Sequence, residues 1–170
     1  MLKLRPYKEC DAEYIQNWIL DEKSFYQWSA GMIGKFPMTD KDLNQHYEKM
    51  KDNPDFWQMS ACDEKNIPVG HMIMRFLDEE KKKLRFGFII VDNKIRGKGY
   101  GKQMLQLAIK YAFEMIQVEE ITLGVFANNP SARYCYQSVG FKEWAAPEQY
   151  SILGESWECI ELGMKRSKLK

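Results

Sequence analysis

Apolar residues recur at helical spacing in four segments of the chain. In the longest of these segments, Leu105, Ile109, Ala112 and Ile116 fall on one stripe, as in a helix that packs one face against a core. The helices predicted from this spacing span residues 11–20, 39–50 and 103–116, with a short helix inside 128–141.

Strands are predicted where apolar residues alternate with polar ones or form short continuous runs. These segments are residues 2–6, 55–63, 67–77, 83–92, 119–126, 141–146 and 156–165. The strand at 83–92 is almost continuously apolar and contains Gly87, where a bulge would be tolerated. Residues 24–37 form an aromatic-rich stretch between two predicted helices, and we expect a loop there.

The resulting element order is β-α-α-β-β-β-α-β-α-β-β. This order predicts an α/β (α+β) fold with a mixed central sheet of six or seven strands and helices on both faces. A chain of 170 residues is long enough for one well-packed core, so we expect a single domain over residues 1–170.

Composition narrows the classes of function. The formal net charge is +1, which gives no overall field to attract nucleic acid or an anionic membrane. No apolar run is long enough to span a bilayer, and the first ten residues lack a signal-peptide core. We therefore expect a cytoplasmic protein, monomeric or homodimeric, with no nucleic-acid or membrane partner.

Metal chemistry has little support in the sequence. The four cysteines are far apart and form no C-x-x-C pair, and only His46 and His71 are present among histidines. We expect reduced thiols and no metal site.

The segment DNKIRGKGYGK, residues 92–102, predicts an anion site. It follows an apolar strand and precedes a long helix, whose first amides have no partners within the helix. Its three glycines let an anion approach the main chain, and its basic side chains add positive charge. A P-loop pattern fails because Arg96 and Gln103 stand at required positions, and a dinucleotide pattern fails because the third glycine comes one residue early.

Two motifs in this region resemble those of the GNAT family of N-acetyltransferases. The pattern [Q/R]-x-x-G-x-[G/A] is matched by Arg96, Gly99 and Gly101. The pattern N-x-x-A-x-x-x-Y-x-x-x-G-F is matched downstream, at every spacing, by Asn129, Ala132, Tyr136, Gly140 and Phe141. The resemblance covers residues 67–141 most firmly.

The resemblance implies that acetyl-CoA is the co-substrate. The main chain of Ile89, Ile90 and Val91 would pair with the pantetheine arm as an added strand. Asn129 and Ala132 would line the other side of the arm, where two parallel strands splay apart. The pyrophosphate would be held by amides of residues Arg96, Gly97, Lys98, Gly99, Tyr100, Gly101 and Lys102.

The implied reaction moves an acetyl group directly from acetyl-CoA to a primary amine within a ternary complex. Tyr136 would protonate the departing thiolate. Many family members carry a glutamate base at the position that is Arg85 here, so this role has no carboxylate to fill it. His71 and the loop residues Asp78, Glu79 and Glu80 are the alternatives.

The acceptor predicted by the resemblance is a small-molecule amine or a protein N-terminus. The missing glutamate leaves a second function open, a sensor or regulatory domain that binds acyl-CoA without turnover. A third, nucleic-acid binding through the basic segment, lacks a recognition motif and a basic overall charge.

Overall fold

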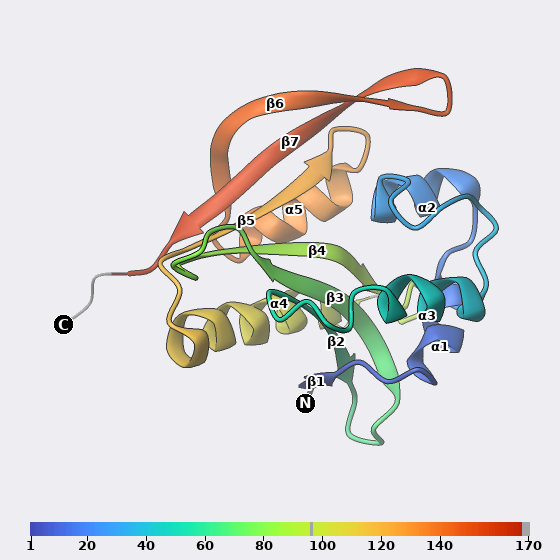
Figure 1. Cartoon of the computed structure of the whole chain (residues 1–170), viewed down its shortest axis with the longest axis horizontal. Helices are drawn as coiled ribbons and strands as arrows, with labels where there is room; N and C mark the ends of the chain where they lie inside the picture. The colour runs from blue at the N-terminus through green and yellow to red at the C-terminus, as the bar shows by residue number, and fades with distance from the viewer. Residues whose placement is uncertain (96, 168–170) are drawn as a thin grey trace.

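The computed structural model describes residues 1–95 and 97–167, and its centre is a seven-stranded mixed sheet (Figure 1). The strands lie in the order β1-β2-β3-β4-β5-β7-β6. The elements are β1 (Lys3–Pro6), α1 (Asp11–Trp18), α2 (Glu22–Ser29), α3 (Asp40–Glu48), β2 (Phe56–Cys62), β3 (Pro68–Phe76), β4 (Lys83–Val91), α4 (Tyr100–Lys110), the π-helical turn η1 (Tyr111–Ile116), β5 (Glu120–Phe126), α5 (Pro130–Ser138), β6 (Lys142–Ile152) and β7 (Glu155–Lys165).

The predicted fold class and sheet are confirmed, with one additional helix. Residues 22–29, in the region expected to be a loop, form α2. The Asp21 side chain caps this helix by accepting a hydrogen bond from the Ser24 amide at 2.7 Å. Phe25 and Trp28, three residues apart, are buried on its inner face.

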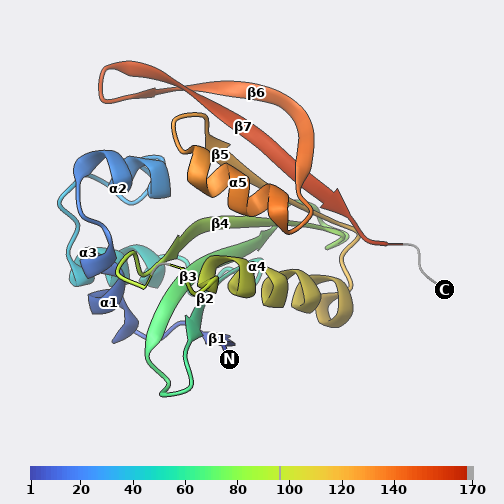
Figure 2. The same ribbon diagram turned by 180° about the vertical axis from the view of Figure 1, so that it is seen from behind.

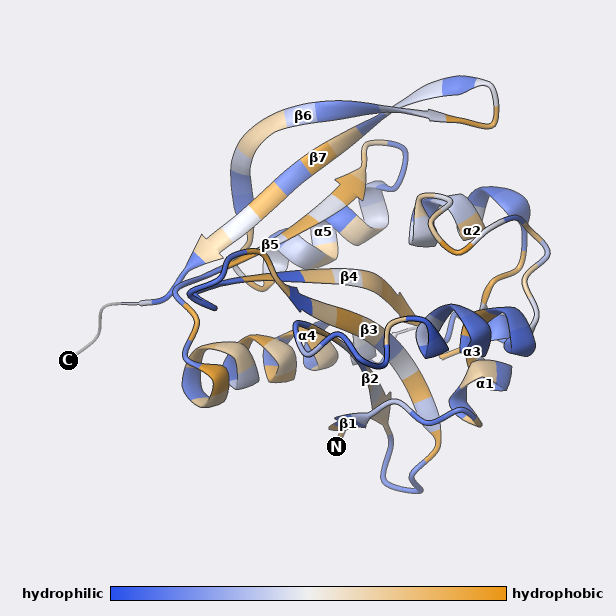
Figure 3. Cartoon of the chain, in the orientation of Figure 1, coloured by the Kyte–Doolittle hydropathy of each residue, from blue (hydrophilic) through white to orange (hydrophobic). Residues whose placement is uncertain are grey.

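Helices cover both faces of the sheet (Figures 1 and 2). On one face Ile15, Phe25 and Leu43 from α1, α2 and α3 pack in one apolar cluster with Phe88 of β4. On the other face α4 buries Met104, Leu105 and Ala108 against the sheet. Most residues of helix α3 are hydrophilic (Figure 3), and its Leu43 and Tyr47 are buried.

Strands β4 and β5 run parallel, and they separate after three residue pairs. Pairing extends from Lys83 opposite Glu120 to Arg85 opposite Thr122, and the two strands then diverge. Between β4 and β3 the register shifts from Gly87 opposite Ile73 to Ile90 opposite His71. Phe88, inside this bulge, has a φ of +48°, a left-handed conformation that is uncommon for a bulky residue. The bulge and the splay lie on the same stretch of β4.

Candidate active site

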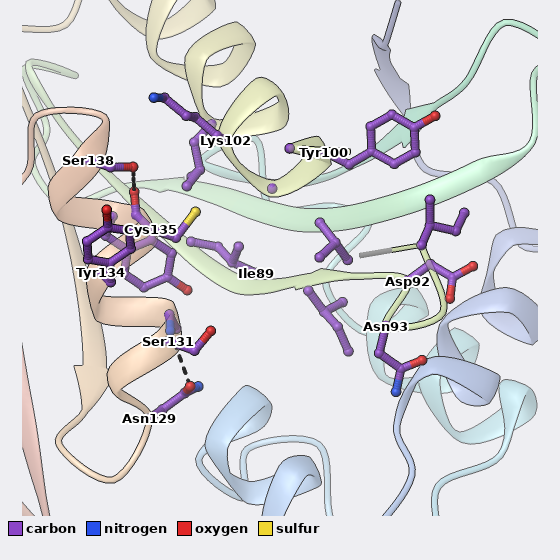
Figure 4. A pocket seen from close by; sticks show the side chains of 18 of the residues that line it. Ile89, Asp92, Asn93, Tyr100, Lys102, Asn129, Ser131, Tyr134, Cys135 and Ser138 are labelled. Atoms are coloured by element: carbon purple, nitrogen blue, oxygen red, sulfur yellow. Dashed lines mark hydrogen bonds between the residues drawn. The ribbon is translucent and has the colours of Figure 1, made fainter. Parts of the chain in front are cut away.

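A cavity of about 410 Å³ occupies the space opened by the splay (Figure 4). Its walls are the last residues of β4, the glycine segment with the start of α4, and α5. It brings together most of the predicted site, namely Ile89, Ile90, Val91, Gly97, Gly99, Tyr100, Gly101, Lys102, Asn129, Ala132 and Tyr136.

Two predicted residues are not placed on this wall. Arg96 lies outside the residues that the structure describes. Lys98 does not line the cavity, and its carbonyl oxygen accepts a hydrogen bond from Gln103 Nε2 at 3.0 Å. Lys98 therefore contributes to the shape of the turn.

The glycine turn leaves free amides at the mouth of the cavity. Gly97 and Gly99 have φ values of +81° and +69°, which side chains rarely allow. The Gly99 carbonyl accepts the first helical bond of α4, from the Gln103 amide at 2.9 Å. The amides of Tyr100 to Lys102 precede that bond, so this end of the cavity can hold an anion such as a diphosphate.

The Gly101 position faces α5 across a narrow gap. A Cβ atom built at Gly101 would lie 3.6 Å from Cys135 Sγ and 3.9 Å from Val91 Cγ1. A larger side chain would therefore enter the space between α4, β4 and α5.

The main chain of β4 forms the floor of the cavity. From Gly87 onward the edge that faces β5 has no strand partner, whereas the opposite edge pairs with β3. Unpaired amide and carbonyl groups of this kind are the groups with which an extended ligand can pair as an additional strand. Pantetheine, which contains two amides, matches that requirement.

Helix α5 begins at the cavity wall. The Asn129 side chain accepts a hydrogen bond from the Ala132 amide at 3.3 Å and caps the helix. Figure 4 shows Asn129, Ser131, Tyr134 and Cys135 along this wall, across from the strand that carries Ile89. Asn129 and Ala132, the first two matched residues of the N-x-x-A-x-x-x-Y motif, therefore form the start of the helix that carries Tyr136.

Tyr136 of α5 lies on the cavity wall. Its side chain is 7% exposed and lines both the 410 Å³ cavity and a second one of about 240 Å³. Burial, with a smaller effect of Cys135, raises the pKa of Tyr136 above its ordinary value. Its phenol makes no hydrogen bond to another described residue, which leaves the hydroxyl available to a ligand.

The usual base position holds an ion pair. The Arg85 guanidinium donates to both carboxylate oxygens of Glu161 on β7, at 2.6 and 3.1 Å, and to Thr122 Oγ1 on β5 at 3.1 Å. Burial opposes the charge of Arg85, but the hydrogen bonds to Glu161 raise its pKa overall. Arg85 therefore cannot accept a proton.

The alternative bases considered from sequence lie away from the cavity. His71 is fully buried, its Nε2 is 2.7 Å from the Tyr47 hydroxyl, and burial lowers its pKa to about 3. The Asp78 carboxylate accepts hydrogen bonds from the amides of Lys82 and Lys83 in the loop before β4. Glu79 and Glu80 are exposed in the same loop.

Sequence reasoning missed the contribution of α2. Gln27 and Trp28 of this helix line the 240 Å³ cavity, which also reaches Ile89, Asn129 and Tyr136. Trp28 Nε1 donates a hydrogen bond to the Phe88 carbonyl at 2.8 Å, so α2 is fixed to the bulge of β4. The signal in the sequence that could have revealed this helix is the three-residue spacing of Phe25 and Trp28 after Asp21, a residue type that often caps helices.

The site and the fold define an acyl-CoA-dependent transferase, and the comparisons with known proteins agree. The sequence profile of the acetyltransferase (GNAT) family matches residues 8–141. The chain therefore belongs to that family, as its two motifs predicted. The prediction of an acetyl-CoA-dependent N-acetyltransferase, which moves an acetyl group to an amine, is confirmed.

Relatives with different acceptors are similar to this chain. A spermidine N(1)-acetyltransferase of Vibrio cholerae is 23% identical over 168 residues, covering 98% of this chain and 94% of the relative. An L-amino acid N-acetyltransferase of Escherichia coli is 24% identical over 106 residues, covering 62% of this chain and 65% of the relative. The Vibrio cholerae spermidine enzyme solved with CoA and spermine has the same fold, with a TM-score of 0.81 at 21% identity, covering 98% of this chain and 96% of that one.

Two further observations concern the described residues. None of their helices combines the length and apolar character needed to cross a membrane. No group of three or more His, Cys, Asp or Glu side chains among them is arranged to hold a metal ion.

Proposed function

We propose that the cavity between β4, α4 and α5 binds acetyl-CoA and that the acetyl group passes directly to a bound primary amine. In this proposal residues 1–170 form one N-acetyltransferase domain. The observation that carries the assignment is the coincidence of an unpaired strand edge with a helix N-terminus in one cavity. Pantetheine lies along Ile89–Val91, and the diphosphate accepts hydrogen bonds from the amides of the glycine turn.

The chemistry requires three things of the protein. The β4 main chain orients the thioester and polarises its carbonyl. Tyr136, which lines both connected cavities, gives its proton to the CoA sulfur as that thiolate leaves. The attacking amine must be neutral. Arg85, at the usual base position, is a cation that cannot accept a proton, so in this proposal the amine loses its proton to solvent.

Thermal stability measures the cofactor site directly. Saturating acetyl-CoA stabilises the folded state by mass action and raises the Tm of the wild-type protein. Gly99→Val and Gly101→Val are expected to remove that shift, because a branched side chain excludes the diphosphate from the amides. A normal shift in both variants would show that the diphosphate lies elsewhere.

Gly154→Val is the matched control for backbone strain. Gly154 lies between β6 and β7 with a φ of +75°, close to the +69° of Gly99, and has no atom within 4 Å of its built Cβ. This variant is expected to lose stability as Gly99→Val does, while retaining the full acetyl-CoA shift.

One observation favours a second function, an acyl-CoA sensor without turnover. Arg85 stands where a base carboxylate was expected, and it is fixed in an ion pair. A panel of primary amines separates the two functions, because turnover releases free CoA thiol in proportion to acceptor consumed. Binding of acetyl-CoA without thiol release from any amine would favour the sensor.

A further inference from the structure

A third cavity, of about 110 Å³, lies on the α2 side of the splay. It shares Gln27, Trp28 and Gly124 with the 240 Å³ cavity, which in turn shares Tyr136 with the cofactor cavity. The three cavities therefore adjoin in series, and the 110 Å³ cavity beside α2 opens to solvent at the exposed side chains of Met32 and Arg75. The 110 Å³ cavity is where an acceptor would lie if acetyl-CoA occupies the cofactor cavity.

The 110 Å³ cavity carries a positive charge. Arg75 of β3 and Arg85 of β4 both line it and stand directly opposite each other in the sheet. Like charges at directly opposed positions destabilise a sheet unless a carboxylate neutralises them. Only one of these two arginines has a carboxylate partner. Glu161 pairs with Arg85, whereas Arg75 has no ion pair with any described residue.

The surroundings of Arg75 support a site for a ligand anion. Arg75 is an exposed residue at the mouth of the cavity. Partial desolvation, and then the charge of Arg85, lowers the pKa of Arg75, yet a guanidinium stays charged at neutral pH. No Asp or Glu among the described residues lines this cavity or the 240 Å³ cavity that leads to it. Glu161 lies next to this cavity but is paired with Arg85. A polyamine, which carries several positive charges, would have to compete with Arg85 for that carboxylate.

The other walls of the 110 Å³ cavity are largely apolar and aromatic. Met32, Phe88 and Phe126 line it, and Trp28 forms a wall that it shares with the 240 Å³ cavity. An apolar body therefore fits beside a single cationic group. A planar guanidinium binds a carboxylate through two parallel hydrogen bonds.

We infer that the acceptor is a small amine that carries its own carboxylate, of the amino acid class, and that Arg75 binds this carboxylate. The inference rests on the proposed function, because it assigns the acceptor of the same reaction. The neutral amine attacks the thioester carbon, the C–S bond breaks, and the CoA sulfur leaves with the proton from Tyr136. The acylated nitrogen releases its extra proton to solvent, and the Tyr136 phenolate takes one back from solvent. The products are the N-acetyl amino acid and CoA.

Matched acceptor pairs test the inference by thiol release. L-leucine is compared with 3-methylbutylamine, and L-phenylalanine with phenethylamine, since each pair differs in the carboxylate. Leucylglycine tests a more distant carboxylate, O-phosphoethanolamine tests a phosphate in its place, and spermidine tests a polycation. We expect the carboxylate-bearing member of at least one pair to have a kcat/KM ten- to hundredfold above its partner.

Variants at Arg75 assign the effect to one side chain. Arg75→Gln is expected to raise KM for the carboxylate-bearing acceptor ten- to hundredfold, with the acetyl-CoA thermal shift unchanged. Arg75→Glu is expected to reverse the preference in favour of the amine without a carboxylate. Arg166→Gln, which removes an arginine beyond the end of β7 and outside the three cavities, is expected to change neither.

The outcomes separate a failure of the acceptor assignment from a failure of the proposed function. The inference is overturned if thiol release does not depend on the carboxylate, or is greatest with spermidine or with O-phosphoethanolamine. It is also overturned if Arg75→Gln leaves thiol release unchanged. In each case the proposed function still stands. Absence of thiol release with every amine, when acetyl-CoA still raises the Tm, overturns the proposed function and the inference with it.

Discussion

At the scale of single residues, Arg85 shows how one position can exchange a chemical role for a structural one. It stands at the last paired residue before β4 and β5 separate, opposite Thr122. Its guanidinium bonds to Thr122 on β5 and to Glu161 on β7, so it joins three strands at the base of the splay. These bonds tie β4, β5 and β7 together where β4 and β5 begin to separate.

Tyr136→Phe tests the proposed acid. The change keeps the buried ring and removes only the hydroxyl, so packing and acetyl-CoA binding should stay within a few-fold of wild type. We expect kcat to fall by about a hundredfold or more at neutral pH, measured by thiol release with saturating acetyl-CoA.

The pH dependence of that defect is its control. Burial raises the pKa of Tyr136, so the wild-type phenol keeps its proton throughout the neutral and mildly alkaline range. As pH rises, the CoA thiolate becomes more stable relative to the thiol and can leave without a proton. The difference in kcat between wild type and Tyr136→Phe should therefore narrow as pH rises. Equal rates at neutral pH, with chemistry rate-limiting, would make Tyr136 a packing residue.

His71 predicts a loss of stability in acid. Its pKa falls from 6.5 to about 3 on folding because burial disfavours the charged ring. Above pH 6.5 neither state binds the proton. Between about pH 6.5 and 3 the unfolded chain binds it and the folded chain does not, so the free energy of unfolding decreases as pH falls, by up to about 1.4 kcal/mol per unit.

The check is the slope of unfolding free energy against pH, from denaturant titrations between pH 4 and 7. His71→Asn should flatten this slope relative to wild type, although it lowers stability at pH 7 by removing the contact with Tyr47. His46→Asn, at a half-buried site, should change the slope less. Identical slopes for wild type and His71→Asn would contradict the prediction.

At the scale of elements, α2 joins the proposed acceptor cavity to β4. Trp28→Phe keeps an aromatic ring but removes the indole bond to the Phe88 carbonyl at the bulge. We expect about 1 kcal/mol of lost stability and a reduced kcat/KM for the acceptor, with the acetyl-CoA shift retained.

Trp157→Phe provides the comparison. Trp157 is also buried, and its Nε1 donates to Glu155 Oε1 at 3.0 Å in the β6–β7 hairpin. A similar loss of stability with unchanged kinetics is expected. If the two variants had the same kinetics, the Trp28 bond would have only a structural role.

The elements that the sequence predicted correctly are those with long patterns or local motifs. Residues 103–116 contain enough turns to show a stripe, and the glycine turn and the Asn129 cap depend on neighbours in sequence. Helix α2 has eight residues, about two turns, so its aromatic residues were equally consistent with a loop. The Arg85–Glu161 pair joins residues 76 positions apart, and no local pattern encodes it.

At the scale of the whole molecule, the groups to which the proposed reaction assigns a role are main-chain amides and carbonyls and the Tyr136 hydroxyl. None of these groups needs a metal ion. Among the described residues, no cluster of ligands is arranged for a metal ion. We therefore expect thiol release to continue unchanged after dialysis against a strong chelator. If activity were lost and then restored by zinc or magnesium, the protein would have a metal site after all.

The unpaired edge of β4 has a consequence for how such a protein can change over generations. An edge presents the same amide and carbonyl groups whatever side chains it carries, so substitutions at Ile89–Val91 can accumulate without altering what the edge offers to a ligand. The cavity beneath α2 is built from side chains, and a single exchange such as Arg75 to an acidic residue would reverse its charge. Related proteins can thus keep the same acyl donor while their specificity for the acceptor amine changes.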